Sequence, residues 1–354
     1  MEKVKFGIIG LGSIADVHAE ALAQCPNCEL TACYSPSPDK ADRFAQNYGL
    51  EPYTDSESFF NSSGIQAVSV ATPSGCHLEA ALGAIAKGKH IIVEKPLEIT
   101  VERCRKIIDA ANAKGVKLSG IFQSRFYDAP RLVKKAIDEG RFGTPVLGSA
   151  YVKWFRSQAY YDSGAWRGTW EIDGGGALMN QSIHAVDLLQ WFMGPVTEIG
   201  AFTETLAHKR IAVEDTGAAV LKFANGALGV IEGTTGSYPG ALKKIEITGT
   251  EGSAVIEEDM LKVWQFKDER KEDEEIRERF GKKSDSAGGA SDPKAILSEG
   301  HAKQFCDFAD AIIRDRKPFI SGEDALCAVR IVTAIYESKR SRAFVKLDRP
   351  FAEY

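Results

Sequence analysis

The segment Val4-Lys5-Phe6-Gly7-Ile8-Ile9-Gly10-Leu11-Gly12-Ser13-Ile14-Ala15 begins as an apolar run and continues into a G-x-G-x-x-A spacing. The run predicts a buried strand, and the spacing is typical of the turn where a dinucleotide pyrophosphate approaches the backbone. A helix predicted from about residue 15 to about residue 24 would aim its free N–H groups at the phosphates. A chance glycine-rich turn is the alternative, but the position between a strand and a helix argues against it. We therefore expect Gly10, Gly12, Ser13 and Ile14 to contact a dinucleotide.

Apolar strands and amphipathic helices alternate through the rest of the first 120 residues, which predicts an α/β fold with a parallel sheet covered on both faces. We expect a Rossmann domain over residues 1–122 and a second domain over residues 123–354. Because parallel strands end at one edge of the sheet, Thr72 and Pro73 are expected beside the cofactor. The predicted strands span residues 29–33, 67–70, 91–93 and 116–120, and the predicted helices span residues 38–48, 77–87 and 101–113.

Glu94-Lys95-Pro96 follows the predicted strand at residues 91–93. A lysine at this edge can polarise a hydroxyl or a carbonyl, or help to move its proton. The glutamate supplies a compensating charge, and the proline fixes the path of the chain. Taken alone, the tripeptide also fits a solvated turn. Its place next to the glycine loop favours a catalytic role for Lys95.

The end of the second strand informs the choice between NAD and NADP. An acidic residue there would bind the ribose 2′-hydroxyl of NAD, but this chain has Ser35 and Ser37, with Lys40 a little further on. The two prolines of this segment also fit a simple turn and helix start. The missing carboxylate slightly favours NADP, and the use of both cofactors stays open.

A helix predicted from Ala177 to Phe192 follows three glycines. Asn180, His184 and Asp187 are spaced four and three residues apart, so they share one face of this helix. A lone helical histidine is more often structural than catalytic, but the asparagine on the same face favours a substrate site.

Several motifs together resemble the glucose–fructose oxidoreductase / inositol dehydrogenase / MocA family. Besides the glycine loop and Glu94-Lys95-Pro96, they lie at residues 71–77, 88–90, 166–170, 174–184, 322–324 and 334–338, so the resemblance covers nearly the whole chain. It implies a second domain built on a large, open, mostly antiparallel sheet, and homodimers or homotetramers. It also implies NAD(P)-dependent oxidation of a sugar, inositol or nucleotide-sugar hydroxyl, or the reverse reduction.

The resemblance extends to individual residues and also shows one departure. It places Trp166 and Arg167 near the nicotinamide and Gln123 along the cofactor crevice, with Arg125 as a weaker candidate. Many family members carry aspartate where this chain has Asn180, and asparagine cannot take up a proton. The proton transfer is therefore expected from Lys95 or His184, while Asn180 orients the substrate.

The expected site residues fall into three sets. The expected catalytic residues are Lys95, His184 and Asn180, and the expected substrate contacts are Lys95, Trp154, Asn180 and His184. The expected cofactor contacts are Gly10, Gly12, Ser13, Ile14, Ser35, Ser37, Lys40, Thr72, Pro73, His77, Glu94, Lys95, Gln123, Trp166 and Arg167.

Two other classes of function stay open. Some relatives are redox-neutral glycosidases or lyases that keep a bound NAD, and the asparagine at position 180 also fits a dinucleotide or sugar sensor without turnover.

Composition fits a cytoplasmic enzyme. The chain has 354 residues, 44% of them hydrophobic, and a formal charge of −5 without a basic stripe, which argues against nucleic-acid binding. No apolar stretch approaches membrane-spanning length, and the strand so close to Met1 leaves no room for a signal peptide. The seven cysteines are scattered, and Cys25 and Cys28 read as a structural or incidental pair. The other histidines, His18, His90, His208 and His301, show no metal-ligand spacing, so no metal site is expected.

Two further segments of the carboxyl-terminal part carry expectations. Residues 267–289 are rich in charged and small residues, which predicts a solvated edge or hairpin excursion followed by a mobile loop. Amphipathic helices are predicted at about residues 300–314 and 324–339, and the last one is expected to pack back against the first domain.

Overall fold

The computed structural model describes residues 2–281 and 298–347, and these form two compact units. The first unit comprises Met1–Gln123, Glu171–Gly174 and Leu297–Val329. The second comprises Ser124–Trp170, Gly175–Ile296 and Arg330–Tyr354. The sequence-based boundary between residues 122 and 123 stays a prediction.

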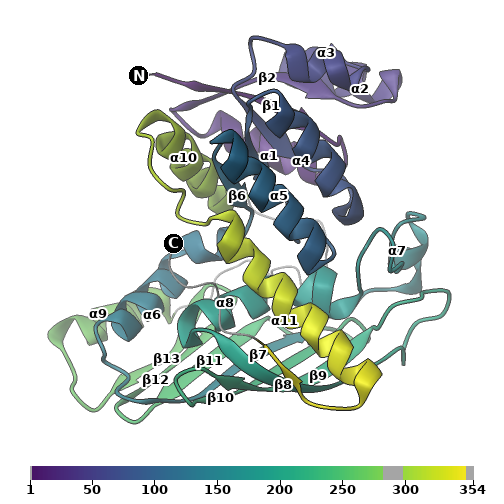
Figure 1. Cartoon of the computed structure of the whole chain (residues 1–354). Helices are drawn as coiled ribbons and strands as arrows, with labels where there is room; N and C mark the ends of the chain where they lie inside the picture. The colour runs from purple at the N-terminus through teal and green to yellow at the C-terminus, as the bar shows by residue number, and fades with distance from the viewer. Residues whose placement is uncertain (1, 282–297, 348–354) are drawn as a thin grey trace. The chain divides into compact units, whose positions relative to one another are not determined.

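The first unit is built on six parallel strands in the order β3-β2-β1-β4-β5-β6, with β1 and β4 at its centre (Figure 1). This order reverses between β1 and β4, which is the doubly wound arrangement, so the predicted Rossmann fold is confirmed. Short strand β3 and helix α3 were not anticipated from the sequence. The strands are β1 (Val4–Ile9), β2 (Cys28–Tyr34), β3 (Glu51–Tyr53), β4 (Ala67–Val70), β5 (His90–Val93) and β6 (Leu118–Gly120), and the helices between them are α1 (Ser13–Ala23), α2 (Pro38–Tyr48), α3 (Ser56–Asn61), η1 (Ser74–Cys76), α4 (His77–Ala86) and α5 (Val101–Lys114).

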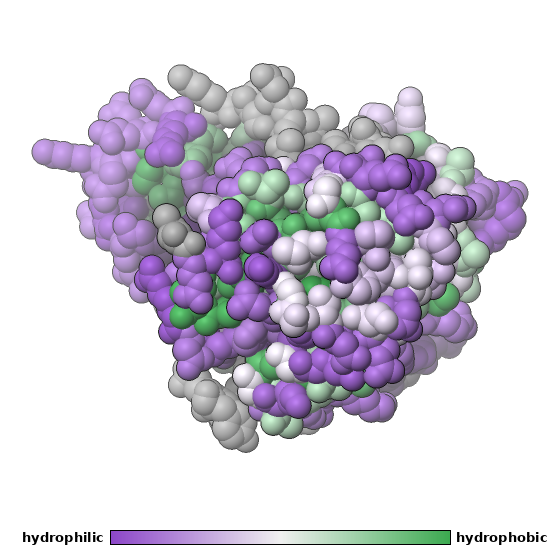
Figure 2. All heavy atoms as spheres, turned by 90° about the horizontal axis from the view of Figure 1, so that it is seen from above, coloured by the Kyte–Doolittle hydropathy of each residue, from purple (hydrophilic) through white to green (hydrophobic). Residues whose placement is uncertain are grey.

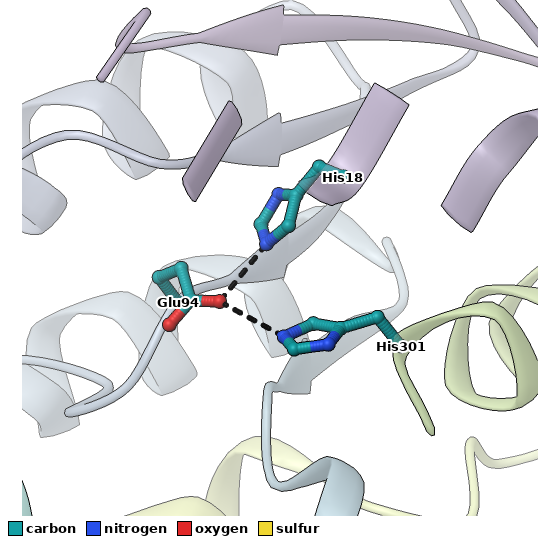
Figure 3. A group of neighbouring side chains, drawn as sticks. All are labelled: His18, Glu94 and His301. Atoms are coloured by element: carbon teal, nitrogen blue, oxygen red, sulfur yellow. Dashed lines mark hydrogen bonds and ion pairs between the residues drawn. The ribbon is translucent and has the colours of Figure 1, made fainter. Parts of the chain in front are cut away.

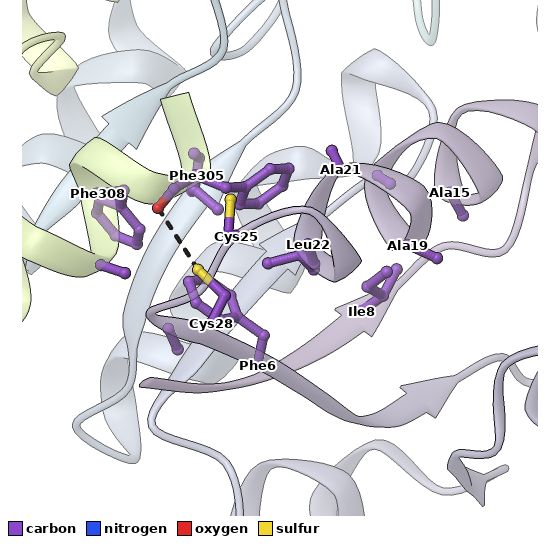
Figure 4. Close-up of a cluster of buried hydrophobic side chains, with 14 of the residues drawn as sticks. Phe6, Ile8, Ala15, Ala19, Ala21, Leu22, Cys25, Cys28, Phe305 and Phe308 are labelled. Atoms are coloured by element: carbon purple, nitrogen blue, oxygen red, sulfur yellow. Dashed lines mark hydrogen bonds between the residues drawn. The ribbon is translucent and has the colours of Figure 1, made fainter. Parts of the chain in front are cut away.

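A helix from late in the chain completes the core of the first unit. Helix α10 (Glu299–Ile313) packs against α1, and its Phe305 and Phe308 rings lie 5.8 and 6.3 Å from the ring of Phe6 on β1 (Figure 4). The start of α11 (Gly322–Ser341) also packs here, because a Cβ added at Gly120 would lie 2.3 Å from the Cβ of Ala325. The six-stranded parallel sheet thus depends on residues that follow it by about two hundred positions.

The second unit contains an eight-stranded sheet in the order β13-β12-β11-β7-β10-β9-β8-β14 (Figure 1). Among the described strands of this sheet, only β7 and β10 pair in parallel, so the expected mostly antiparallel sheet is confirmed. The strands are β7 (Pro145–Lys153), β8 (Val196–Glu204), β9 (Thr216–Phe223), β10 (Leu228–Thr234), β11 (Lys244–Gly249), β12 (Gly252–Glu257), β13 (Met260–Phe266) and β14 (Val345–Lys346).

Helices cover one face of this sheet. Leu189 and Met193 of α8 (Ile183–Met193) come so close to Gly148 of β7 that a Cβ there would lie 2.6 Å from Met193 Cγ. Other helices of this unit are α6 (Asp128–Asp138), α7 (Gln158–Asp162), η3 (Ala177–Ser182), α9 (Lys271–Phe280) and the part of α11 from Arg330 onward, while η2 (Gln123–Phe126) spans the first boundary between the units in the sequence. We call the opposite face, which exposes Leu147, Phe202, Val220 and Leu228, the open face of the sheet.

The charged segment after β13 differs from the expectation. Residues 271–280 form helix α9 instead of a hairpin excursion, since Asp273 receives hydrogen bonds from Arg141 and from the Trp264 indole that fix the helix start. The loop expected after it falls on residues that lie outside the described part of the chain.

Among the described residues, no helix combines the length and the apolar character that crossing a bilayer would require. The face of the molecule in Figure 2 mixes hydrophilic residues with smaller hydrophobic patches, as expected for a surface with both signs of charge.

Candidate functional site

The glycine loop forms an open cradle at the start of α1. Gly10 has φ +91°, and a Cβ there would lie 2.5 Å from Thr72 N, so only glycine fits. A Cβ added at Gly12 would meet no described atom within 4 Å, and no side chain caps the helix that begins at Ser13. The first N–H groups of α1 therefore face open space, which fits a pyrophosphate.

Two polar side chains after other strands of the same sheet also fit a polar ligand. Thr72 follows β4 and Gln123 follows β6. The buried Thr72 Oγ1 and Gln123 Oε1 receive no hydrogen bond from any described residue. Buried polar oxygens are rarely left without a donor, so their arrangement fits a bound dinucleotide.

Ser35, Ser37 and Lys40 lie where β2 leads into α2. Ser35 is buried, and its hydroxyl accepts a hydrogen bond of 3.2 Å from the backbone N–H of Ser37, the residue that precedes α2. Lys40 is exposed on the first turn of α2. The local fold thus gives Ser35 a structural partner and leaves the lysine accessible.

His77 is occupied on both sides of its ring. Its Nδ1 lies 2.9 Å from the carbonyl oxygen of Pro96, and its Nε2 lies 2.9 Å from that of Thr72. Burial lowers the pKa of His77, with the two backbone contacts acting in the opposite direction. The ring thus connects the loop after β4 with the loop after β5. A direct cofactor contact through a ring nitrogen would need one of these carbonyls to be released, so that contact stays a prediction.

Glu94 is the centre of a buried cluster at the end of β5 (Figure 3). Its Oε1 lies 2.9 Å from His18 Nε2 on α1 and 3.6 Å from His301 Nε2 on α10, and its Oε2 accepts a hydrogen bond of 2.9 Å from the backbone N–H of Lys95. Burial acts to raise the pKa of Glu94, but the histidines outweigh it and hold this pKa well below its usual value. The carboxylate is therefore charged, and it fixes the backbone of the lysine that we expect to be catalytic.

Nothing in the sequence connects His18 with His301. Their ring nitrogens and a Glu94 oxygen all lie within 4.8 Å of one another, so these three groups could hold a metal ion, and the expectation of no metal site stays a prediction. The two histidines are too far apart in the sequence for a spacing rule to connect them, and α10 brings them together by packing on α1.

In the second unit, a buried glutamate that the sequence analysis missed holds the glycine-rich turn. Glu214 accepts hydrogen bonds from the backbone N–H groups of Gly176 (3.0 Å) and Leu178 (2.8 Å) and from the Tyr336 hydroxyl (2.9 Å). Burial raises the pKa of Glu214 to about 7, although these three donors act to lower it. The available signal was the acidic pair Glu214-Asp215 next to a strand, because carboxylates are costly to bury without partners.

The segment that carries Asn180 and His184 is not a single α-helix. Its first part, η3, is a π-helix, and α8 begins only at Ile183, so the predicted helix over residues 177–192 is wrong in its first turn. Single π-turns occur frequently at functional sites. Asn180 accepts a hydrogen bond of 2.7 Å from Gln181 Nε2, which orients its amide, and both Asn180 and His184 are half-buried.

Asp187, on the same helical face, has a structural role. It is fully buried and forms two hydrogen bonds with Arg125, at 2.6 and 2.8 Å. This bidentate ion pair ties Arg125 of η2 to α8. Arg125 is thus engaged in the second unit, and its weaker assignment to the cofactor crevice stays a prediction.

Aromatic rings and guanidinium groups gather beside Asn180 in what we call the aromatic–arginine cluster: Trp154, Arg156, Tyr160, Trp166 and Arg167. The Arg167 guanidinium lies 4.3 Å from the centroid of the Tyr160 ring and 4.5 Å from that of Trp166. Arg156 lies 5.0 Å from the Trp154 ring, and its Nε donates a hydrogen bond of 3.0 Å to Gln181. Through Gln181, the structure therefore connects the expected substrate contacts Trp154 and Asn180.

The expected site residues thus form two groups, one in each unit. Lys95 and the cofactor contacts up to Gln123 belong to the first unit, and the rest belong to the second. The expected approach of Lys95 to His184 stays a prediction.

Comparison with known proteins gives consistent matches over both units. Residues 4–122 match an oxidoreductase family with an NAD-binding Rossmann fold, and residues 131–255 match a GFO/IDH/MocA C-terminal domain. The chain is 30% identical over 296 residues to levoglucosan dehydrogenase of Pseudarthrobacter phenanthrenivorans, covering 72% of this chain and 74% of that protein. It is 26% identical over 356 residues to scyllo-inositol 2-dehydrogenase (NAD(+)) of Bacillus subtilis, covering 98% and 97%. The solved structure of the WlbA dehydrogenase from Bordetella pertussis, in complex with NADH and UDP-GlcNAcA, is 32% identical, with a TM-score of 0.88 over 98% of this chain and 100% of that one.

Proposed function

Because the chain belongs to the GFO/IDH/MocA family of NAD-binding oxidoreductases, we propose that it transfers a hydride between a nicotinamide and a hydroxyl-bearing carbon of a sugar, an inositol or a nucleotide sugar. The observation that carries the proposal is the position of Lys95. It follows β5 directly, and the charged Glu94 carboxylate holds its backbone N–H at the sheet edge that also carries the open glycine cradle. Ligands of doubly wound sheets bind at that edge.

The proton-transfer residues in this proposal are Lys95 and His184. Bound NAD(P) would supply the hydride acceptor or donor. Lys95 and His184 contact the reacting oxygen, and one of them exchanges its proton. Histidine suits this exchange near neutral pH because its unperturbed pKa is about 6.5. Asn180 binds a substrate hydroxyl without taking up its proton, and Gln181 supports this by fixing the amide orientation.

The aromatic–arginine cluster supports a carbohydrate substrate. Flat rings such as Trp154 suit the apolar faces of sugar rings, and guanidinium groups suit phosphate or carboxylate oxygens. Arg156 is almost fully buried, so its charge lies in a water-poor environment. These features favour a sugar that carries an anionic group, and the match to a dehydrogenase solved with UDP-GlcNAcA is consistent with a nucleotide sugar.

For the cofactor, we keep NADP as slightly favoured over NAD. The support is the absence of a carboxylate among residues 34–38, with Lys40 exposed just beyond. Two of the relatives named above, the scyllo-inositol 2-dehydrogenase and the WlbA dehydrogenase, are described with NAD(+) or NADH, so NAD is the competing choice. Measuring kcat/KM with each cofactor decides between them, and a clear preference for NAD would refute this part of the proposal.

We also propose that the enzyme is cytoplasmic and forms homodimers or homotetramers through the open face. Phe202 on β8 is 81% exposed, and Val220 and Leu228 on the adjacent strands are 52% and 57% exposed. Contiguous exposed apolar side chains of this kind mark interaction surfaces. Phe202→Glu should therefore lower the mass measured by light scattering to that of the monomer; an unchanged mass would exclude this face as the interface.

The main test combines a substrate panel with a lysine variant. Protein, NAD(P) and a panel of sugars, inositols and nucleotide sugars are mixed, and absorbance is followed at about 340 nm. Net reduced cofactor supports the dehydrogenase, product without a net change in the cofactor supports a redox-neutral hydrolase or lyase, and saturable binding alone supports a sensor.

Lys95→Met should abolish turnover and leave dinucleotide binding intact. Lys106→Met, at an exposed lysine of α5 paired with Glu102, is the matched control. Turnover by Lys95→Met close to that of the control would refute the assignment of Lys95.

A further inference from the structure

The backbone around Lys95 is held on both sides by buried histidines, and we propose that His18 and His77 are positioning residues for Lys95. Glu94 precedes the lysine and is bound by His18, whereas Pro96 follows it and is contacted by His77. Neither histidine needs to touch substrate or cofactor in this role. The inference rests on the proposed function, because it presupposes that Lys95 acts in the reaction.

On the amino-terminal side of Lys95, a chain of hydrogen bonds runs from the sheet to the lysine backbone. Ser69 Oγ on β4 lies 2.8 Å from His18 Nδ1, and Glu94 Oε2 accepts the Lys95 N–H at 2.9 Å. Between them, His18 Nε2 lies 2.9 Å from Glu94 Oε1 (Figure 3). His18 and Ser69 are fully buried and Glu94 nearly so, so little water competes for these bonds. The serine fixes the orientation of the imidazole, and the imidazole fixes the carboxylate.

On the carboxyl-terminal side, His77 connects two loops of the same sheet edge. Its ring lies between the carbonyl oxygens of Thr72 and Pro96, at 2.9 Å from each, and it is almost fully buried. His77 is the first residue of α4. Its ring donates to one of the two carbonyl oxygens when neutral and to both when protonated, so the loops after β4 and β5 lie against one helix start. Lys95 is thus the residue between two anchored neighbours, with its side chain carried by a rigid backbone.

The distances favour a hydrogen-bonded cluster over a metal centre at His18, Glu94 and His301. Two ligand atoms that each lie about 2.1 Å from a tetrahedral zinc ion are about 3.4 Å apart. The 2.9 Å between His18 Nε2 and Glu94 Oε1 is shorter, and it is the usual length of a hydrogen bond. Glu94 also accepts the backbone N–H of Lys95 with its second oxygen, so both oxygens have donors without an ion.

The test uses substitutions that remove the hydrogen bonds of each positioning histidine and, for His18, one that retains them. His18→Leu and His77→Leu should each lower kcat at least about ten-fold, because small displacements of a catalytic group cost one to two orders of magnitude. The substrate KM and the dinucleotide Kd should stay within about two-fold. His18→Gln, whose amide can donate to Glu94 and accept from Ser69, should recover most of the lost kcat. His90→Gln, at the other end of β5, is the matched control and should retain full activity.

The outcomes separate this inference from the function on which it rests. An active Lys95→Met overturns the proposed function. An inactive Lys95→Met together with a normal kcat in folded His18→Leu and His77→Leu overturns only the positioning role. Equal losses in kcat and in dinucleotide affinity would also overturn it, because they indicate a general defect. If the leucine variants do not fold, Ser69→Ala takes the place of His18→Leu. An unchanged kcat in Ser69→Ala refutes the positioning role of the hydrogen-bond chain from Ser69 to the Lys95 backbone. Stoichiometric zinc in the purified chain that is lost in His301→Ala would show a metal site at His18, Glu94 and His301 and would overturn the interpretation as a hydrogen-bonded cluster.

Discussion

Replacing Glu214 by glutamine should change how the stability of the second unit depends on pH. Burial raises the pKa of Glu214 to about 7 in the folded chain, against a usual value of 4.5. The folded state therefore binds the proton more tightly than the unfolded state. The stabilisation by the protonated side chain is complete below about pH 4.5 and is lost as the pH rises to about 7. At ~1.4 kcal/mol per pH unit, the loss amounts to about 3 kcal/mol.

The assay is thermal unfolding of the wild type and of Glu214→Gln at a series of pH values from about 4.5 to about 7.5. Glutamine cannot ionise, and its amide NH₂ meets the N–H groups of Gly176 or Leu178, so the variant should be less stable at the acidic end by about 1–3 kcal/mol. This wild-type advantage should shrink by about 3 kcal/mol across the series, which corresponds to about 6–12 °C in the difference between the two melting temperatures.

The adjacent carboxylate offers a control with the opposite sign. Burial acts to raise the pKa of Asp215, but hydrogen bonds from the backbone N–H groups of residues 206–208 outweigh it and keep this pKa below its usual value of 3.8. The stabilisation by the Asp215 carboxylate is present above pH 3.8 and is lost only below it. The difference in the free energy of unfolding between the wild type and Asp215→Asn should therefore be constant over the same pH series. A wild-type advantage over Glu214→Gln that is constant, or that grows with pH, would refute the reasoning. It would mean that the three donors keep Glu214 ionised.

Two further predictions use matched pairs of variants. Gly12→Ala should lower dinucleotide affinity and leave the melting temperature nearly unchanged, because its methyl group enters only the open cradle. Gly10→Ala should destabilise the ligand-free chain by more than about 1 kcal/mol, because Gly10 has a positive φ. Equal melting temperatures for the two variants would contradict this prediction. Asp187→Asn should lower the free energy of unfolding, measured with denaturant, by about 3–5 kcal/mol, because it leaves the charge of the buried Arg125 uncompensated. Asp138→Asn, in an exposed ion pair with Lys134, should lower it by less than about 1 kcal/mol. Similar losses of free energy in the two variants would contradict the importance of burial.

The fold of the first unit could be predicted largely because its signals are local. The segment over residues 4–15 combines a strand, a tight turn and a helix start in twelve residues, and the helical and apolar periods that follow repeat the same unit. What could not be predicted depends on long-range packing. Phe305 and Phe308 belong to the core around Phe6, but nothing in the local sequence of α10 indicates which sheet it covers. Strand β3 has only three residues, too few for a periodic signal.

The candidate site shows the same limit. The sequence predicts candidate catalytic segments where reactive residue types occur at strand and helix ends. These segments are Glu94-Lys95-Pro96 and the segment of Asn180 and His184. The supporting residues were missed because each is unremarkable in its own segment. His18 lies within the apolar pattern of α1, and Tyr336 lies within that of α11, so only the folded chain shows that they bind carboxylates. The π-turn of η3 was missed because an extra residue in one turn leaves the apolar pattern nearly unchanged.

Both units support their expected catalytic segments by burying a glutamate that accepts backbone N–H groups, but the two glutamates titrate in opposite directions. Glu94 binds the N–H of Lys95 and lies against two imidazoles, so its charged form is favoured and a negative charge is fixed beside the lysine backbone. Glu214 binds the N–H groups of Gly176 and Leu178 with only neutral donors around it, so burial favours its protonated form. A neutral carboxyl there avoids placing a second buried charge near the segment of Asn180 and His184, where a charge would favour the protonated form of the histidine. We therefore expect the glycine-rich turn to weaken as the pH rises from about 4.5 to about 7, while the support of Lys95 persists over this range.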